Sequence, residues 1–326
     1  MKKEEIALTN STPAISDPRV AALFAEDVTA SSGRAYKCDL LHFIEWCNHH
    51  DLNPLPCTPM SLVQFLTEHS EGYAMSTVER RAAAVSWAHK KAGYLGDDNP
   101  RLSPLVTEAL RLLRRRYKKQ GTKQAKELNT EIIREAVKNC TEDPNSVLGL
   151  RDATIILIGF AGAFRRSEIV SLTVEDLAWV KQGLEITVRW SKTDQEGRGA
   201  VKKIPAGQIP SSCPVKSLEK WLKTAEIEAG PIFRRVFKNG RVGDEALSGQ
   251  AIYNAIKARM QHIGLENWKD FSPHSMRSGF ASVAAENGAS LQSIKGQGGW
   301  KSDSVAMRYI RNREEWENAA GYKLGL

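Results

Sequence analysis

The sequence predicts a mainly α-helical protein of two domains, with a small antiparallel β-sheet in the second domain. Its 326 residues exceed the usual length of one domain, so two domains and a sizeable core are expected. Apolar residues recur at helical spacing through most of the chain. The exception is residues 184–205, where alternating and β-branched residues lie on both sides of a glycine-containing turn, as in a pair of strands.

The N-terminal part predicts a polar arm followed by an all-helical domain. Residues 1–18 are polar and predict a flexible arm, whereas residues 19–117 have the apolar spacing of successive helices. Gly93 is a stop signal, and three of the helices begin with an N-cap residue or a proline. The helical segments are 40–47, 60–69, 76–93 and 103–119, and the start signals are Thr58-Pro59, Ser76-Thr77 and Ser103-Pro104.

Residues 118–128 predict a basic linker. Between Ala109 and Lys126 the chain has eight basic residues and no acidic one. Such a run fits a linker that lies on a negatively charged partner. It also fits a solvated helix end, because cations are favourable near the C-terminus of a helix.

The second domain, residues 129–326, is expected to be mostly helical around the predicted sheet. Helical segments precede residue 184 and resume after residue 205, and the last of them carries Tyr309. A polar tail with a few apolar residues follows it.

Composition excludes several classes of protein. Hydrophobic residues make up 41% of the chain and charged residues 26%, which is typical of a globular protein. No run of eighteen apolar residues and no apolar leader occurs, so neither membrane insertion nor secretion is expected. The five cysteines form no CxxC pair, which favours reduced thiols in a cytoplasm over disulfides or a zinc site. The net charge of +8 favours a polyanionic partner.

Common catalytic motifs are missing from the sequence. It contains no GxxxxGK[ST], no GxGxxG after a strand, no HExxH and no GxSxG, and no carboxylate cluster with the spacing of metal ligands. We therefore expect no cofactor, no bound metal and no use of ATP.

Four short segments instead place polar residues where they could take part in chemistry. His274 and Arg277 lie one turn apart after Ser272-Pro273, where side chains and free helix N–H groups could bind an anion. Each segment alone also has a structural interpretation, such as a capped helix, a local ion pair, a lysine in a turn or core packing. The other three segments are FRRSEI, with Arg165, Arg166 and Glu168; WSKTDQEG, with Lys192; and GGWKSDSVAMRYIRN, with Trp300 and Tyr309.

Together, these segments resemble the tyrosine site-specific recombinases, or phage integrases, and most closely the Cre-like recombinases. The order FRRSEI, SKT, HSMR, GGW and then a tyrosine in VAMRYIRN matches the catalytic set of that family. FIEWC and the helix from Ser76 extend the similarity, so that it covers most of residues 30–311. It implies an N-terminal core-binding (SAM-like) domain and a mixed α/β catalytic domain.

The resemblance implies a role for each catalytic candidate. Two arginines would grip the scissile phosphate, a lysine would serve as general acid, and a tyrosine would be the nucleophile. Arg166 is an alternative to the first arginine, although alignment on the following Ser-Glu favours Arg165. Tryptophan replaces the histidine that most of the family has at residue 300. The implied catalytic set is Arg165, Glu168, Lys192, His274, Arg277, Trp300 and Tyr309.

The resemblance also implies double-stranded DNA as partner, with inverted half-sites that each bind one protomer of a homotetramer. The tail after Tyr309, with Trp316, Tyr322 and Leu324, would dock in trans on a neighbouring protomer. A type IB-like topoisomerase, a telomere resolvase and a non-catalytic DNA-binding regulator are the alternative functions. The implied DNA contacts are Arg34, Lys37, Thr77, Arg80, Arg81, Arg235, Lys238 and Gln250.

Overall fold

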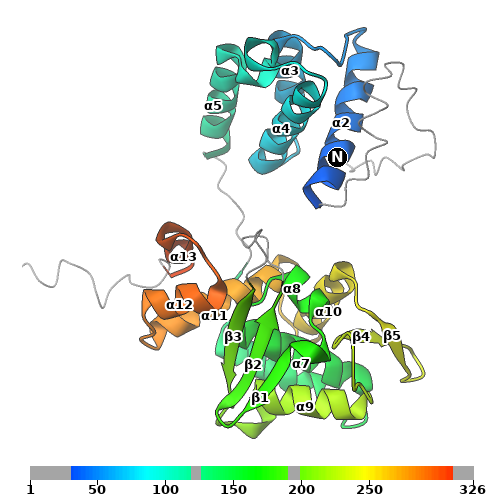
Figure 1. Ribbon diagram of the computed structural model, residues 1–326, viewed down its shortest axis with the longest axis vertical. Helices are drawn as coiled ribbons and strands as arrows, with labels where there is room; N and C mark the ends of the chain where they lie inside the picture. Colours follow the sequence, from blue (N-terminus) through cyan, green and yellow to red (C-terminus); the bar gives the residue numbers. More distant parts are fainter. Residues whose placement is uncertain (1–30, 119–125, 190–198, 311–326) are drawn as a thin grey trace, which may run out of the picture. The chain divides into compact units, whose positions relative to one another are not determined.

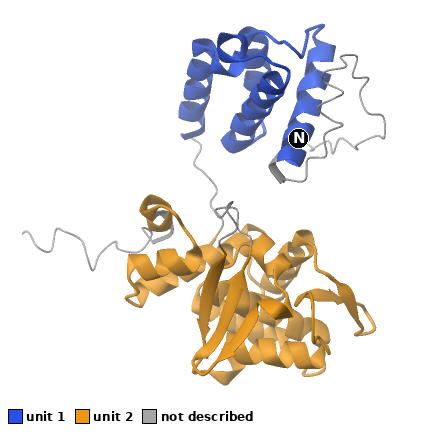
Figure 2. Cartoon of the chain, viewed as in Figure 1, with its two compact units in different colours: residues 1–123 blue, residues 124–326 orange. Residues whose placement is uncertain are grey.

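The computed structural model describes residues 31–118, 126–189 and 199–310, with the backbone alone for residues 31, 32 and 308–310. The chain divides into two compact units, residues 1–123 and residues 124–326 (Figures 1 and 2). No helix among the described residues is long and apolar enough to cross a membrane.

The first unit is helical throughout its described residues, as predicted. α2 packs on α4 and α3 packs on α5, around a core that includes Phe43, Phe65 and Leu110. The Thr58 hydroxyl accepts a hydrogen bond from the Ser61 N–H at 3.1 Å, which confirms that N-cap. The helices are α2 (Ser31–His49), α3 (Pro59–Glu68), α4 (Met75–Lys91) and α5 (Pro104–Lys118), with short 3-10 turns at Gly96–Asp98 and Pro100–Leu102.

One predicted start signal in this unit is wrong. α4 begins at Met75, so Ser76 and Thr77 lie inside the helix and do not cap it. Its N-cap position is Ala74, which has no polar side chain to bond the free N–H groups. Gly93 lies just beyond the helix with a φ of +89°, a conformation that glycine adopts without strain, as expected of a stop signal.

The second unit combines helices with two small antiparallel sheets (Figure 1). Strands β2 and β3 pair in the register Ile186 with Lys202, which confirms the predicted antiparallel pair. The helices are α6 (Thr130–Cys140), α7 (Val147–Ala161), α8 (Arg166–Ser171), α9 (Pro214–Thr224), α10 (Gly249–His262), α11 (Pro273–Glu286), α12 (Leu291–Gly298) and α13 (Asp303–Ile310), with 3-10 turns at Val174–Asp176, Pro210–Ser212 and Trp268–Asp270. The strands are β1 (Leu177–Val180), β2 (Gly183–Val188), β3 (Ala200–Pro205), β4 (Arg234–Val236) and β5 (Val242–Ala246).

Helix α7 is the centre of the second unit. Its residues from Gly149 to Gly159 are buried, and it packs against α6, α9, α10 and α11. Inside this apolar packing, Asp152 accepts hydrogen bonds from Arg151 at 2.7 Å and from Arg259 of α10 at 2.9 Å. Because four helices pack around α7, its C-terminal end is fixed within the unit. The turn that follows it leads directly to Arg165 and α8.

Candidate active site

Arg165 is held at the start of α8 by Glu168. It occupies the N-cap position, and its backbone N–H donates to the Glu168 carboxylate at 2.9 Å. Its Nη1 donates to the other oxygen of the same carboxylate at 2.6 Å. Glu168 is buried, so this charge-assisted pair is shielded from solvent. The guanidinium is therefore fixed at the beginning of the helix while its side chain stays partly exposed.

His274 and Arg277 lie one turn apart at the beginning of α11, as predicted. The backbone N–H of Ser272 donates to the Ser275 hydroxyl at 3.0 Å, which stabilises the start of the helix. Arg277 is buried, and its Nη1 donates to the carbonyl of Ala163 at 2.6 Å. His274 is exposed, yet desolvation by the surrounding protein, followed by the positive charge of Arg277, lowers its pKa. Its imidazole is therefore neutral at pH 7.

Trp300 joins the two arginine segments. Gly299 ends α12 with a φ of +63°, in the left-handed region, which turns the chain toward the arginines. The Gly299 carbonyl accepts a hydrogen bond from Arg165 Nη2 at 3.3 Å. Trp300 is buried, and the guanidinium carbon of Arg277 lies 4.3 Å from the centre of its ring, a cation–π contact. The GGW segment thus packs against both arginines.

These groups line an open cavity of about 770 Å³. Two guanidiniums, an imidazole and an indole reach it from α8, α11 and the segment after α12, and Arg166 lines it as well. Such a set of donors with positive charge suits an anion with several oxygens, such as a phosphate. The lining residues are Phe164, Arg165, Arg166, Tyr253, Ser272, Pro273, His274, Arg277, Trp300, Lys301, Ser302 and Val305.

Two of the predicted catalytic residues are not among the side chains that the structure describes. Lys192 lies outside the described residues. Tyr309 is in the last turn of α13, where the backbone alone is described. Val305, one turn earlier on the same helix, lines the cavity, and positions four residues apart share one face of a helix.

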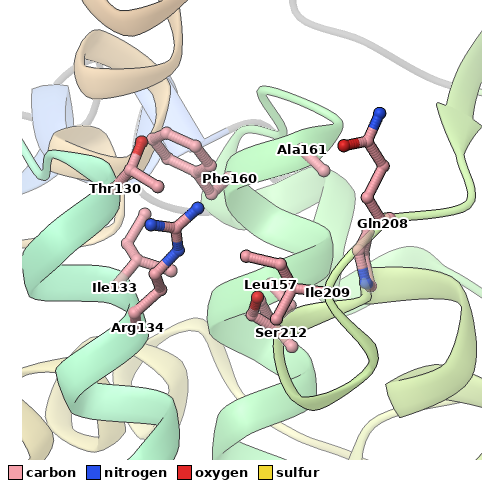
Figure 3. A pocket seen from close by; sticks show the side chains of 11 residues that line it. Thr130, Ile133, Arg134, Leu157, Phe160, Ala161, Gln208, Ile209 and Ser212 are labelled. Carbon is pink, nitrogen blue, oxygen red and sulfur yellow. The ribbon is translucent and has the colours of Figure 1, made fainter.

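A second cavity, of about 340 Å³, lies elsewhere in the same unit (Figure 3). Phe160 and Leu157 of α7, Ile133 of α6 and Ile209 of the loop before α9 give it a mostly apolar wall. Arg134 is the one charged side chain among its described lining residues. None of the predicted catalytic residues lines it, so the polar cavity is the better candidate for chemistry.

One buried lysine was missed by the sequence analysis. Lys202 lies on β3 with its side chain in the interior, and its Nζ is 3.7 Å from a carboxylate oxygen of Glu168. The alternation of buried and exposed positions along β3 is the signal that could have revealed it. Lys202 and Ile204 occupy the buried positions, and Lys203 between them is exposed.

The predicted DNA contacts are spread over both units. Arg34, Arg80, Arg235, Lys238 and Gln250 are exposed, and Lys37 and Thr77 are half-buried. Arg80 is held by Asp39, which accepts hydrogen bonds from its Nε at 2.7 Å and its Nη2 at 3.1 Å.

Arg81, in contrast, is in the interior of the first unit and not on the surface that we assigned to DNA. Its guanidinium lies 4.1 Å from the centre of the Tyr73 ring and 5.8 Å from that of Phe65. Arg80 and Arg81 are neighbours on α4, so the helical turn points one outward and the other toward α3.

No group of three or more His, Cys, Asp or Glu side chains is placed to hold a metal ion in the described part of the chain. The predicted independence from metal stays a prediction.

The phage integrase family matches residues 126–315. An integrase/recombinase of Selenomonas ruminantium, a xerD homologue, is 36% identical over 279 residues, which cover 85% of this chain and 80% of that protein. The Cre recombinase of Escherichia phage P1 is 24% identical and covers 82% of this chain and 80% of its own. A λ integrase tetramer bound to a Holliday junction shares the fold, with a TM-score of 0.60, 16% identity, and coverage of 92% of this chain and 77% of its own.

These matches agree with the order of the catalytic segments and with the fold that brings four of their side chains to one cavity. The chain therefore belongs to the phage integrase family and is a tyrosine recombinase, an enzyme of site-specific DNA recombination.

Proposed function

We propose that this recombinase cuts and rejoins two DNA duplexes through a 3′-phosphotyrosine intermediate and a Holliday junction, without ATP or metal. The observation that supports this most is the cavity in which Arg165, His274, Arg277 and Trp300 meet. It has the charge and the donors that a scissile phosphate requires, and α13, which carries Tyr309, contributes to its wall.

The two arginines fit the demands of the transition state. Attack of a tyrosine oxygen on a phosphodiester passes through a pentavalent phosphorane that carries additional negative charge. Planar guanidiniums can donate two hydrogen bonds each to its nonbridging oxygens. Arg165 and Arg277 are already held by Glu168 and by the Ala163 carbonyl, so little reorganisation is needed when the charge develops.

Proton transfer completes the proposed reaction. The phenol, with an unperturbed pKa of about 10, loses a proton as it attacks, and the 5′ oxygen gains one as it leaves. His274 suits the first step because its lowered pKa keeps it neutral and able to accept a proton. Lys192 is proposed for the second step. The phosphotyrosine ester conserves the energy of the broken bond, so the 5′ hydroxyl of a partner strand can displace the tyrosine without ATP.

The proposed DNA target has two inverted half-sites, each bound by one protomer. Four strand cleavages need four active sites, so the working assembly is a tetramer on DNA. The proposed contacts are side chains that reach the surface of their unit: Arg34, Lys37, Thr77 and Arg80 of the first unit and Arg235, Lys238 and Gln250 of the second. The tail after Tyr309 is proposed to dock on a neighbouring protomer.

The covalent step can be tested with a nicked duplex. Such a duplex can be selected by the wild-type chain from a random DNA pool and nicked in the spacer between its repeats. Incubation in excess EDTA should give an SDS-stable adduct through a 3′ phosphate, and Tyr309→Phe should give none. An adduct in the variant, or a strict need for Mg²⁺, would refute the proposed chemistry. On a supercoiled plasmid that carries the selected site, relaxed circles without exchanged strands would indicate a topoisomerase.

The role of the tail can be tested by deletion of residues 314–326. Binding to one half-site should change little, whereas cooperative filling of the second half-site and recombination should be lost. Gel shifts across a protein titration measure both quantities. Unchanged cooperativity would show that the tail does not join protomers.

A further inference from the structure

Lys202 places a buried ammonium group directly behind the candidate active site. It alternates inward with Ile204 on β3, and its side chain is 5% exposed. Its Nζ donates hydrogen bonds to the carbonyls of Gly162 at 2.6 Å, Ala163 at 3.3 Å and Gln297 at 2.9 Å. The same nitrogen lies 4.6 Å from the centre of the Phe164 ring. Three hydrogen-bond donors thus meet three backbone acceptors in the interior of the unit.

The three carbonyls belong to the two segments that carry the catalytic side chains. Gly162 and Ala163 form the turn between α7 and Arg165, and Ala163 has a φ of +47°, which is strained for a residue other than glycine. The Ala163 carbonyl also accepts from Arg277. A conformation of this kind persists only where its surroundings hold it, and here two cations bind its oxygen.

The third carbonyl belongs to the segment that leads to Trp300. Gln297 is in the last turn of α12, where carbonyls have no partner within the helix. Two residues later, the Gly299 carbonyl accepts a hydrogen bond from Arg165, and Trp300 follows. Lys202 therefore connects the turn before Arg165 to the end of α12.

We propose that Lys202 is a positioning residue of the active site, whose ammonium sets Arg165, Arg277 and Trp300 around the scissile phosphate by holding these two segments together. The inference rests on the proposed function, because its readout is strand cleavage. Lys202 is not a catalytic residue in this proposal, since it touches backbone carbonyls and does not line the cavity.

The protonation state of Lys202 gives the proposal a distinctive signature. The pKa of Lys202 is lowered to about 7, mainly because the side chain is buried. The negative charge of Glu168 raises this pKa, whereas the positive charges of Arg277 and Arg165 lower it. These three groups, from α8, α11 and the residue before α8, are the charged side chains that act on it most. Above this pKa the neutral amine has two N–H groups for three carbonyls and no positive charge. The held geometry should therefore weaken as the pH rises through about 7 in the DNA-free protein.

Three variants separate positioning from simple stability. Lys202→Met removes the ammonium but keeps an unbranched side chain, and Lys202→Arg keeps a charge that does not titrate. Lys203→Met is the matched control, because Lys203 is the next residue of β3 and its side chain is 77% exposed. Each full-length variant is tested with the selected nicked duplex for affinity by gel shift, for single-turnover cleavage, and for thermal unfolding.

We expect Lys202→Met to cleave about a hundredfold more slowly, the scale of a small misplacement of catalytic groups, with duplex affinity within about threefold of wild type. Lys203→Met should match wild type in both. Cleavage that is unchanged in Lys202→Met, or lowered equally in Lys203→Met, would overturn the proposal. Absence of any adduct in wild type would instead count against the proposed function itself.

If Lys202→Met is too unstable to assay, a pH profile of wild type and Lys202→Arg tests the proposal instead. At DNA concentrations far below saturation, the cleavage rate reports titrations of the free protein. The ratio of the wild-type rate to that of Lys202→Arg should fall by at least about tenfold between pH 6 and pH 9, because only the wild-type side chain loses its proton. His274 is present in both proteins and cancels in the ratio. A constant ratio would overturn the proposal.

Discussion

Substitution of Glu168 by glutamine should destabilise the catalytic unit strongly. The Glu168 carboxylate is 2% exposed and accepts two hydrogen bonds from Arg165, at 2.9 and 2.6 Å, with Lys202 Nζ at 3.7 Å. In Glu168→Gln the amide has one acceptor oxygen where the carboxylate has two, and its NH₂ group must face a donor. The buried guanidinium of Arg277 is a further positive charge that acts on Lys202. The variant therefore leaves the buried Lys202 and the partly exposed Arg165 without their counter-charge.

The expected loss follows from these contacts. Removing one partner of a buried ion pair costs about 3–5 kcal/mol. For a unit of the size of residues 124–326, each kcal/mol corresponds to roughly 2–4 °C in Tm, so the transition of this unit should fall by about 6–20 °C. Differential scanning calorimetry of the full chain without DNA measures this change.

The matched control is Glu185→Gln. Glu185 lies 3.7 Å from Lys203, and both side chains are more than a third exposed, so the pair should contribute at most about 1 kcal/mol. A Glu168→Gln protein that melts within about 2 °C of wild type would show that the surrounding dipoles, and not the carboxylate, balance the buried cations.

Further predictions concern chemistry, packing and thiols. Arg277→Ala should lose at least about a hundredfold in cleavage of the nicked duplex but little affinity, because Arg277 is proposed as only one of many phosphate contacts; equal losses in gel-shift and cleavage assays would make it an affinity residue. Gly279→Ala should lower the free energy of unfolding by about 3 kcal/mol in urea titrations, because a Cβ atom there would lie 1.9 Å from the Leu128 carbonyl oxygen. Gly296→Ala, whose Cβ would meet nothing within 4 Å, should raise it by up to about 1 kcal/mol, and similar effects of the two would contradict the packing argument. Cys38 is exposed and the other four cysteines are buried, so one thiol per native chain should react rapidly with DTNB; a second fast thiol would contradict this.

Regular apolar spacing predicted the helices well, whereas short polar strands escaped it. α3 and α5 match their predicted segments closely, because one face of each helix is buried in the core. β4 and β5 were missed, since neither has a fully buried position to mark one face, and β5 contains a glycine and two acids. β1 was missed for a similar reason, because its residues after Leu177 are exposed.

The candidate site was predicted by the order of short segments and not by spacing alone. Arg165 and Arg277 meet because α7 and α11 pack together, a long-range contact that no local pattern contains. Lys202 escaped because a lysine in a strand is usually exposed, and its burial depends on carbonyls from Gly162 and Gln297, far away in the sequence. The prediction that Arg81 contacts DNA was wrong because a helical arginine can serve either DNA contact or core packing. Its contact with the Tyr73 ring, which the sequence pattern does not reveal, shows that it packs in the interior.

The indole at residue 300 has a consequence for how the charge of the cavity changes with pH. An indole N–H donates a hydrogen bond but does not titrate between pH 5 and pH 8, whereas an imidazole in its place would change charge in that interval. Among the described side chains that line the cavity, His274 alone belongs to a type that titrates there, and its pKa is lowered. An imidazole at residue 300 would therefore add a positive charge to the cavity on mild acidification, whereas the indole keeps one protonation state throughout.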